Sequence, residues 1–454
     1  MRPSASCCGI SVRLANETSS PAPRILRTKG DAMKLVTLLG LMLFLGGAQV
    51  CAAADAPKPT PAQRILDSRS AITVEGGQLA GTGAGVLHDA TQHADYVLLG
   101  EDHGTAEIPR FADALFTSLV PSGFQTAVVE TGPELSTQLQ KWIAQPAGVK
   151  QFVAFESRFP ATTAFFSWRD EYAFLRHAYT VTGGKLQVWG IDQELMGASG
   201  FLLTSIQAEN PGPRSRALLA ALLQENVKAD AAAYKSGDPS ATLMMTVSRD
   251  KLTALRASLQ TDGTPAALRF ADALLASRDI YVNCCNALAT QSNRDRAHLM
   301  KRNLATYLAA PGATRKKLFF KFGEEHLYRG FNVVRNNDIG NYVAEIADAA
   351  GKSDVHILAL GTGGEQIKFA GMGHWTHATY SISDDEHVRF KYLMPFVDAA
   401  LPTGWTLFDL RPFRTRFNAM QIADKDFERL VWGYDFLLLI PNTTSDDPLD
   451  PSVF

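Results

Sequence analysis

The sequence predicts an α/β protein with a mainly parallel sheet flanked by helices and with a large helical insertion. Three features support this prediction. Short apolar runs bounded by polar residues or glycine recur along the chain, as in buried parallel strands. Stretches with apolar residues at helical spacing lie between these runs. From about residue 200 to 312 no run of the strand type occurs, and Ala, Leu, Arg, Gln and Ser dominate.

The strands are expected where apolar or small residues stand together in short runs. The first is 96–100, Tyr-Val-Leu-Leu-Gly, and the others in chain order are 126–129, 186–191, 317–322, 355–360, the weaker 405–410, and 436–440. After the first strand, apolar side chains from Ile108 to Leu119 recur at i, i+3, i+4 and i+7, which predicts a helix packed on the sheet. The spacing repeats from Leu135 to Ile143. This alternation favours a mainly parallel sheet with helices on both faces.

Composition and charge restrict the class of protein. The chain has 454 residues, enough for two or three average domains or for one large α/β domain with an insertion. Its 46% hydrophobic residues and mean hydropathy of -0.05 are ordinary for a soluble globular protein. The net charge of -2 gives no electrostatic reason to expect a nucleic-acid partner or an anionic membrane surface. A small-molecule substrate is therefore the expected partner.

Residues 1–54 are predicted to be a leader. From Met33 a lysine, an apolar block at 35–45 and small residues before Asp55 follow one another, as in a secretory signal. The block is far shorter than the ~20 residues that span a membrane. We therefore expect translation to start at Met33, cleavage before Asp55, and a periplasmic or secreted protein with no stable membrane association. An uncleaved anchor and an organelle transit segment are the alternatives.

The mature chain is expected to form one domain. Residues 55–75 are predicted to be a linker, 76–445 the α/β domain, and 446–454 a tail. Within the domain, the helical insertion at about 200–312 is placed so that it could cover the active edge of the sheet.

Acidic residues or histidines directly follow four of the strongest predicted strands. They are Glu101 and His103 after the first, Glu130 after the second, Asp192 after the third, and Glu325 and His326 after the fourth. Because the carboxyl ends of parallel strands meet at one edge, these side chains are expected to converge. A single polar strand ending would only indicate a solvated edge. Four such endings, two with histidine, favour a site.

Carboxylates beside histidines suit the activation of water. A neutral imidazole takes the proton, and a carboxylate orients the ring and stabilises its charged form. Gly100 and Gly104 bracket the first cluster and allow a tight turn into a helix near Thr105. His103 would then lie by a helix N-terminus, which is expected to lower its pKa and to favour the base.

Three other features of the sequence can be explained without a functional site. The glycine-rich stretch 361–364 is expected to be an anion cradle or a plain turn. His374 and His377 have the spacing of a helical zinc site but no helical pattern around them, so a loop is favoured. Glu194 is expected to be a solvated loop carboxylate.

Five motifs in order resemble those of the erythromycin esterase-like family, which shares a superfamily with the ChaN haem-uptake proteins and the Tiki proteases. They cover roughly residues 95–440 and read Leu99-Gly-Glu-Asp-His-Gly, Val128-Val-Glu-Thr-Gly, Trp189-Gly-Ile-Asp, Arg294-Asp-Arg-Ala-His-Leu-Met-Lys-Arg-Asn303 and Phe322-Gly-Glu-Glu-His326. The resemblance implies an α/β core with a helical insertion, and ester hydrolysis through an activated water.

The resemblance also implies which residues act. Glu101 and His103 match the family's Gly-Glu…His pair, Glu130 its second-strand glutamate, and His326 the last histidine of its His-Asn-x-His stretch. Arg294 matches its Arg-Asp motif. The chain departs from the macrolide esterases in two ways. The Gly-Glu-x-His spacing is that of the ChaN-like branch, and glycine and glutamate replace the first His and the Asn of His-Asn-x-His.

The leading hypothesis is an exported hydrolase of an ester or lactone. His103 is the expected general base, Glu101 or Glu130 orients it, and His326 stabilises the oxyanion or protonates the leaving group. The residues expected to bind substrate are Asp192, Arg294 and Glu325. No cofactor is expected, although His103, His326 and a glutamate could hold a divalent metal. The alternatives are a non-catalytic haem-binding protein of the ChaN-like type and a metal-dependent protease of the Tiki type.

Overall fold

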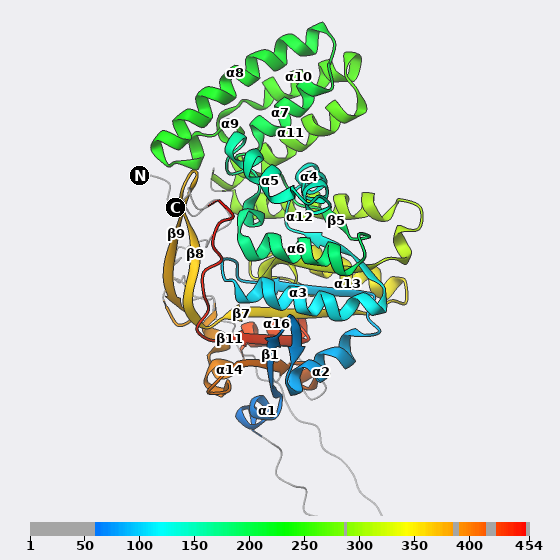
Figure 1. The fold of residues 1–454 in the computed structure, drawn as a ribbon, viewed down its shortest axis with the longest axis vertical. Coiled ribbons are helices and arrows are strands. Elements are labelled where there is room, and N and C mark those ends of the chain that lie inside the picture. The colour runs from blue at the N-terminus through cyan, green and yellow to red at the C-terminus, as the bar shows by residue number, and fades with distance from the viewer. Residues whose placement is uncertain (1–59, 286–287, 385–389, 415–423, 451–454) are drawn as a thin grey trace, which may run out of the picture.

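The structure confirms the α/β class with its helical insertion. The computed structural model describes residues 60–285, 288–384, 390–414 and 424–450. The predicted leader, 1–54, lies outside the described residues. Within the described part, nine strands form one sheet in the order β2-β1-β10-β11-β7-β3-β6-β4-β5, and a separate hairpin pairs β8 with β9. Figure 1 shows the sheet between its helices, with the insertion at the top.

All seven expected strands are present, and four others were not expected. The strands are β1 (Arg69–Glu75), β2 (Gln78–Ala80), β3 (Tyr96–Glu101), β4 (Phe124–Val129), β5 (Gln187–Gly190), β6 (Lys317–Gly323), β7 (Asp354–Gly361), β8 (Gly363–Gly371), β9 (His374–Ser381), β10 (Trp405–Asp409) and β11 (Phe436–Ile440). The six from β11 to β5 are parallel, and β10, β1 and β2 add antiparallel pairs at one side.

The helices of the α/β layers are α1 (Pro61–Asp67), α2 (Thr82–Thr91), α3 (Glu107–Leu119), α4 (Pro133–Ile143), α5 (Gly148–Arg158), α6 (Arg169–Val181), α13 (Ile339–Ala349), α14 (Met394–Ala399), α15 (Arg411–Arg414) and α16 (Lys425–Gly433). Those of the insertion are α7 (Ser199–Ala208), α8 (Pro213–Ser236), α9 (Leu243–Thr246), α10 (Arg249–Asp262), α11 (Pro265–Cys285) and α12 (Ala289–Leu308). The two helices predicted from apolar spacing, 108–119 and 135–143, are α3 and α4.

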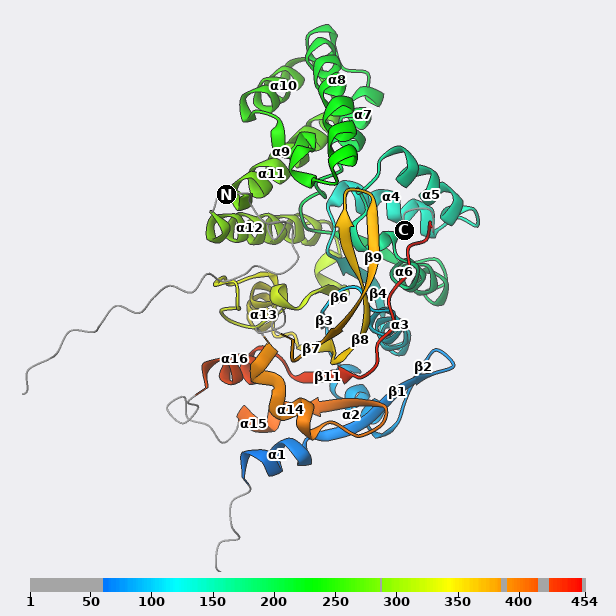
Figure 2. The ribbon, with the colours of Figure 1, turned by 90° about the vertical axis from the view of Figure 1, so that its left-hand side faces the viewer.

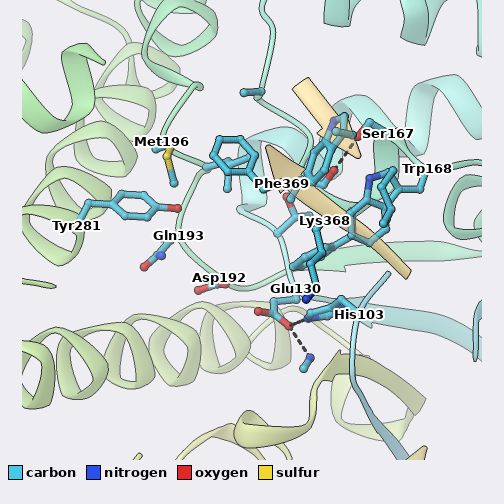
Figure 3. Close-up of a pocket in the computed structure, with 18 of the residues that line it drawn as sticks. His103, Glu130, Ser167, Trp168, Asp192, Gln193, Met196, Tyr281, Lys368 and Phe369 are labelled. Atoms are coloured by element: carbon cyan, nitrogen blue, oxygen red, sulfur yellow. Dashed lines mark hydrogen bonds and ion pairs between the residues drawn. The ribbon is translucent and has the colours of Figure 1, made fainter. Parts of the chain in front are cut away.

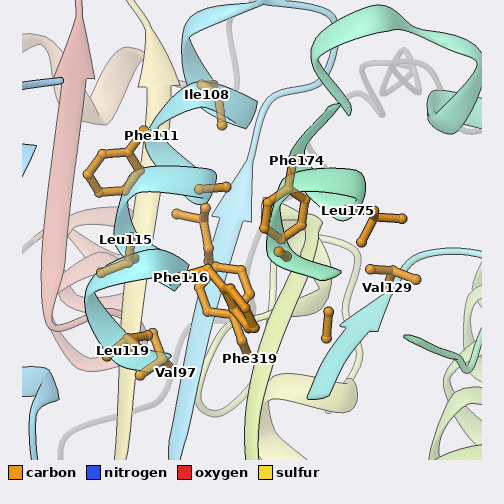
Figure 4. Close-up of a cluster of buried hydrophobic side chains, with 14 of the residues drawn as sticks. Val97, Ile108, Phe111, Leu115, Phe116, Leu119, Val129, Phe174, Leu175 and Phe319 are labelled. Atoms are coloured by element: carbon orange, nitrogen blue, oxygen red, sulfur yellow. The ribbon is translucent and has the colours of Figure 1, made fainter. Parts of the chain in front are cut away.

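One face of the sheet packs against α3, α4 and α6. Every second residue of the central strands points to this side, because successive side chains of a strand alternate between the faces. Phe319 of β6 packs edge-on against Phe116 of α3 at 5.6 Å and close to Phe174 of α6 at 5.9 Å. All three rings are buried. Figure 4 shows this cluster, in which the apolar stripe of α3 covers the strands as its spacing predicted.

The opposite face packs against α12, α13, α14 and α16. The alternate strand residues, such as Leu98, Phe320 and Leu358, are buried here with Met300 and Leu304 of α12. Because α12 begins inside the insertion and ends on the sheet, it joins the two parts of the core. The other insertion helices, α7 to α11, share an apolar cluster of their own.

The hairpin β8–β9 is the largest feature that the strand patterns missed. It runs across the ends of the central strands toward the insertion, as Figure 2 shows. At its tip, the Met372 N–H donates to the Gly237 carbonyl at 3.2 Å, and a Cβ on Gly373 would lie 2.5 Å from the Tyr234 ring of α8. The alternating pattern of β8–β9 is weak because polar residues and glycines occupy both faces.

Two predicted boundaries differ from the structure. The described part of the predicted linker, 60–75, holds α1 and β1, and β1 pairs with β10. The strand was missed because its burial does not alternate cleanly. The described part of the predicted tail, 446–450, packs on the domain. Asp446 is fully buried and accepts the N–H groups of Asp170 and Glu171 at the start of α6. Over the described ranges, no helix combines the length and apolar character needed to cross a membrane.

Candidate active site

The predicted site residues gather at the carboxyl edge of four neighbouring strands. β3, β6, β4 and β5 lie side by side, and the segment after each one carries part of the cluster. Glu101 ends β3, Glu130 follows β4, and His326 follows β6. Asp192 lies just beyond β5. The register pairs Glu101 with Gly323, so the ends of β3 and β6 are level. The expected convergence is therefore confirmed.

The imidazole of His103 is held from three sides. Its Nδ1 lies 2.8 Å from Oε1 of Glu101, and its Nε2 lies 3.4 Å from Oε2 of Glu130. Its ring stacks on Phe165, with centroids 3.7 Å apart. Gly104 has a φ of +105°, and a Cβ there would lie 2.7 Å from a carbonyl oxygen of β8. The turn after His103 therefore requires glycine, and it aims Nε2 at Glu130.

Glu130 is the centre of the cluster. Its Oε2 faces His103 and accepts the backbone N–H of Gly323 at 2.5 Å. Its Oε1 accepts Nη2–H of Arg296 at 2.6 Å and lies 3.6 Å from Nε2 of His326. The side chain is only 7% exposed. One carboxylate thus connects both histidines to an arginine.

Lys321 lies behind this cluster, in the middle of β6. Its Nζ is 2.7 Å from Oε1 and 2.6 Å from Oε2 of Glu101, and 2.5 Å from Oε1 of Glu171 in α6. All three side chains are at most 3% exposed. A buried ammonium is costly unless carboxylates neutralise it, so Lys321 depends on its contacts with Glu101 and Glu171.

The arginine at the site is Arg296 and not the predicted Arg294. Nε of Arg296 donates to both oxygens of Asp192, at 3.0 and 3.2 Å, and Nη2 donates to Asp192 and Glu130. Arg294 is exposed on α12 and does not line the pocket. Along a helix, residues two positions apart point in different directions, so only one of them can face the sheet.

His326 has a carboxylate partner of its own. Its Nδ1 lies 3.0 Å from Oδ2 of Asp338, the residue that caps α13. This contact leaves Nε2 facing Glu130 and the pocket. Glu325, which was predicted to bind substrate, is partly buried and lines the pocket, and its backbone carbonyl accepts Nδ2–H of Asn332 at 2.6 Å.

The pKa of His103 moves in the direction opposite to the expectation. Burial disfavours the imidazolium, but hydrogen bonds to Glu101 and Glu130 and the charges of both carboxylates outweigh it, so the pKa rises from 6.5 to about 10. The expectation of a lowered pKa is wrong because α3 begins only at Glu107, while two carboxylates are in contact with the ring. His103 is therefore an imidazolium at neutral pH in this arrangement.

Neighbouring charges also outweigh burial in setting the pKa values of Glu130 and His326. Burial opposes ionisation of Glu130, but the hydrogen bond to His103 and the charges of His326, His103 and Arg296 lower its pKa well below the usual value. Burial and the charge of Arg296 act against the His326 imidazolium, yet Asp338 and Glu130 raise its pKa. The carboxylates around each histidine thus favour its protonated form.

A pocket of about 620 Å³ opens beside His103 and Glu130. Figure 3 shows Tyr281 and Met196 on one side of it, with Trp168 and Phe369 on the other. Its wall comes from the strand ends, the segment 152–168 from α5 to the turn before α6, the helical insertion, the hairpin β8–β9 and residues 448–450. Residues of the insertion therefore cover the carboxyl edge of the strands, and the hairpin, which was not expected, covers it from another side.

An aromatic series runs from the hairpin to His103. Phe369 lies 5.7 Å from Trp375, and Trp375 lies 5.2 Å from Trp168. Trp168 lies 5.4 Å from Phe165, which stacks on His103. All four aromatic residues line the pocket. This side of the pocket is suited to apolar or flat parts of a ligand.

The three remaining sequence features have structural roles. His374 and His377 lie on the strand β9, where side chains three residues apart point to opposite faces, and His377 pairs with Asp447 at 3.0 Å. Residues 363–365 exchange backbone hydrogen bonds with Thr443. Glu194 is 1% exposed, contrary to expectation, because it accepts the N–H of Glu134 in the first turn of α4. Burial raises its pKa to about 8.

Several site residues were missed by sequence reasoning. Lys321 carried a usable signal, because a lysine inside the apolar run 317–322 has no solvated face. Arg296 belongs to the motif Arg294–Asn303, in which Arg294 was predicted as the functional arginine. Asp338 and Phe165 gave no local signal, since both come from irregular segments whose place depends on the whole fold. Within the described ranges, no group of three or more His, Cys, Asp or Glu is arranged to hold a metal ion.

Solved structures similar to this chain include three with a TM-score of 0.54. A mutant of the erythromycin esterase EreC in its open conformation matches with a TM-score of 0.54 and 16% identity, over 84% of this chain and 99% of that one. A protein from Bacillus cereus matches with a TM-score of 0.54 and 13% identity, over 86% and 100%. A succinoglycan biosynthesis protein matches with a TM-score of 0.54 and 14% identity, over 85% and 97%.

No protein-family model and no curated protein sequence matches the chain. At identities of 13–16% the structural similarity establishes the fold and leaves the substrate open. It covers nearly the whole length of each of these three proteins. The resemblance read from the five ordered motifs is thereby confirmed at the level of architecture: the chain has the erythromycin esterase-like fold.

Proposed function

We propose that the protein is a hydrolase that cleaves an ester or lactone bond by attack of an activated water. The observation that supports this proposal is the arrangement of Glu101, His103 and Glu130, with contacts of 2.8 and 3.4 Å to the imidazole, at the edge of a large pocket. A carboxylate on one ring nitrogen, with the other ring nitrogen at the edge of the pocket, is the arrangement of a general base.

In the proposed reaction, the neutral form of His103 removes a proton from water through Nε2. The water oxygen attacks the carbonyl carbon of the substrate, and Glu101 stabilises the imidazolium through Nδ1. The imidazolium of His326 donates a hydrogen bond to the oxyanion that forms. When this intermediate collapses, the bond to the leaving oxygen breaks and His103 returns its proton to the alkoxide. The net change is addition of one water to the ester.

The resting site must lose a proton before this cycle can start. His103 is charged at neutral pH, because its pKa is about 10. A substrate that displaces the 3.4 Å contact to Glu130 removes one of the two carboxylates that hold the proton. Binding of a neutral ester therefore lowers the pKa of His103 and favours its neutral form, which can act as the base.

The lining of the pocket indicates the kind of ester. Phe165, Trp168, Phe369 and Trp375 form one wall, and the volume of about 620 Å³ suits a molecule of drug size. We infer a bulky substrate with an apolar or ring-shaped part that lies on this wall. Asp192 and Glu325 lie on the polar side, where they would contact its hydroxyl or amine groups.

The test uses the full chain and a panel of p-nitrophenyl esters and aryl lactones of increasing size. We expect hydrolysis by the wild type and a loss of 10²–10⁴-fold in kcat/KM for His103→Asn, the usual contribution of a general base. The matched control is His88→Asn, because His88 is exposed on α2 away from the pocket. Full activity of His103→Asn would end this assignment.

A second measurement separates the hydrolase from a haem-binding protein. Haem is added to the wild type and to His103→Asn, and the visible spectrum is recorded. The proposal expects no saturable Soret shift, since an imidazolium has no free lone pair for iron. A saturable shift that disappears in His103→Asn, together with no ester hydrolysis, would favour ligand binding instead.

We also propose that the protein is exported. The support is the signal-like sequence of residues 33–54, which lies outside the described residues. Intact-mass measurement on protein from the medium or the periplasm tests this. A chain that begins at Asp55 is the expected result, and a chain that retains residues 33–54 contradicts it.

A further inference from the structure

A buried lysine stands behind the catalytic histidine and outside the pocket. Lys321 pairs with Leu99 in the register of β3 and β6, so its side chain shares a sheet face with Glu101. Lys321, Glu101 and Glu171 are each almost fully buried. None of the three lines the pocket, whereas His103 and Glu130 do. A substrate therefore cannot touch the lysine.

Lys321 is connected to His103 through the carboxylate of Glu101. Nζ bridges Glu171 of α6, at 2.5 Å, and Glu101, at 2.6 and 2.7 Å from its two oxygens. Oε1 of Glu101 is also the atom that accepts Nδ1–H of His103 at 2.8 Å. The same carboxylate oxygen thus serves the lysine and the imidazole, and a change at either partner alters the other.

Acidic and basic groups alternate along this series and continue through the site. In order of contact they are Glu171, Lys321, Glu101, His103, Glu130, Arg296 and Asp192. Each inner group has a partner of opposite charge on both sides, which is what makes burial of so many charges tolerable. The two ends of the series lie on different helices or loops, with His103 in the middle.

We propose that Lys321 and Glu171 are positioning residues that act through Glu101 to set the charge and orientation of the His103 imidazole. This inference rests on the proposed role of His103 as the base. It extends the site beyond the pocket wall, to β6 and the first turn of α6.

The groups that face this unit come from four elements. Glu101 and His103 belong to β3 and its end, Lys321 to β6, Glu130 to the end of β4, and Glu171 to α6. Beyond α6 lies Asp446, which accepts the N–H of Glu171 at 3.1 Å. Burial raises the pKa of Asp446 to about 8. Burial also raises the pKa of Glu171, to about 7, although Lys321 opposes this. Glu171 is therefore ionised above pH 8.

Removal of the two charges has opposite consequences for His103. Without the carboxylate of Glu171, the positive charge of Lys321 is less compensated, so the imidazolium is disfavoured and loses its proton at lower pH. Without the ammonium of Lys321, the nearby carboxylates hold the imidazolium more strongly, and it loses its proton at higher pH. A merely structural role gives no such opposition of sign.

The experiment follows His103 directly, by long-range ¹H–¹⁵N spectra of the full chain with ¹⁵N-labelled histidine, from pH 7 to 10.5. The His103 signals are assigned from their loss in His103→Asn. We expect the midpoint to fall by ~1 unit in Glu171→Gln and to rise in Lys321→Met. The matched control is Glu194→Gln, a buried carboxylate that caps α4 and has no contact with His103. It is expected to leave the midpoint unchanged.

Two further measurements keep the test decisive. The double variant Lys321→Met/Glu171→Gln removes one charge of each sign and is expected to return the midpoint close to that of the wild type. If Lys321→Met does not fold, Glu171→Gln decides alone, because glutamine keeps the hydrogen bond to Lys321. An unchanged midpoint in Glu171→Gln overturns the inference.

This readout needs no turnover, so it is independent of the proposed function. Opposite shifts without any ester hydrolysis by the wild type support the positioning of His103 and overturn the hydrolase. Hydrolysis that depends on His103, with midpoints that do not move, supports the hydrolase and overturns the role of Lys321 and Glu171.

Discussion

The imidazole of His103 lies on the ring of Phe165, with the two planes inclined by only 15° and the centroids 3.7 Å apart. Phe165 belongs to the 3₁₀ turn Ala164–Ser167, between α5 and α6. A segment distant in sequence from β3 therefore fixes the plane of the ring, while Glu101 fixes its rotation within that plane. Orientation of the His103 ring depends on both.

Replacement of Phe165 by Ala is expected to lower kcat without a change in fold. An aromatic pair contributes about 0.5–1.5 kcal/mol, so loss of the stack corresponds to roughly 2–13-fold in rate. Phe165→Tyr keeps the ring and is the matched control, with activity near that of the wild type. Steady-state kinetics on the best ester of the panel measures both, and equal kcat for Phe165→Ala and Phe165→Tyr would contradict the role of the stack.

The rate of hydrolysis is expected to rise with pH. His103 acts as a base only when it is neutral, and a pKa of about 10 leaves roughly one part in a thousand neutral at pH 7. We expect log kcat/KM to rise with a slope near one from pH 7 to 9, after correction for spontaneous hydrolysis. A rate that does not change over this range contradicts a charged resting state.

Glu130→Gln checks the cause of that rise. The amide still accepts the Gly323 N–H but no longer carries the charge that stabilises the imidazolium. The rising limb should therefore move to lower pH, since a group whose raised pKa falls becomes neutral earlier. The maximal rate is expected to fall as well, because Arg296 loses one of its two carboxylates. If the rising part of the pH–rate profile stays at the wild-type position, Glu130 does not stabilise the protonated form of His103.

Trp375→Ala is expected to weaken substrate binding more than turnover. Trp375 lies on the hairpin and contacts Trp168 and Phe369 at the pocket wall, but it has no contact with His103. We expect a rise of roughly 5–30-fold in KM for bulky esters, equivalent to about 1–2 kcal/mol, and little change for small ones. The control is Trp432→Ala on α16, because Trp432 is 47% exposed and outside the pocket.

Stability depends on the aromatic cluster between β6 and α3. Phe319→Ala is expected to lower the free energy of unfolding by about 3–5 kcal/mol, because a fully buried ring leaves a cavity among rings that cannot close it. Val227→Ala, at a position 69% exposed, should change it by less than about 0.5 kcal/mol. Chemical denaturation measures both variants, and similar losses in the two would argue against this core.

Much of the architecture could be predicted because the central strands are buried on both faces. Runs such as 96–100 and 436–440 contain almost only apolar residues, as expected of strands that are buried on both faces. The strand β1, next to the edge of the sheet, and the hairpin β8–β9 were missed because their side chains are partly solvated, so polar residues and glycines break the pattern. Their positions follow from pairing with distant segments, which local spacing does not encode.

The candidate site was only partly predictable for a related reason. Strand ends are local features, so Glu101, Glu130 and Asp192 could be placed together from the order of the strands. The helix that supplies Arg296 comes from the insertion, and its rotation about its own axis decides between that residue and Arg294. The charge state of His103 depends on carboxylates from two strands at once, so a rule about one helix end gave the wrong sign.

The alternating series from Glu171 to Asp192 also limits how this sequence can diverge. A single change of charge inside the series leaves a buried partner uncompensated, whereas a simultaneous change of two neighbours preserves neutrality. We therefore expect related chains to vary here in linked pairs, with Lys321 exchanged only together with Glu171 or Glu101. Such covariation would show that selection acts on the total charge of the series. The pocket wall could then change to accept new substrates while the charged residues behind it stay the same.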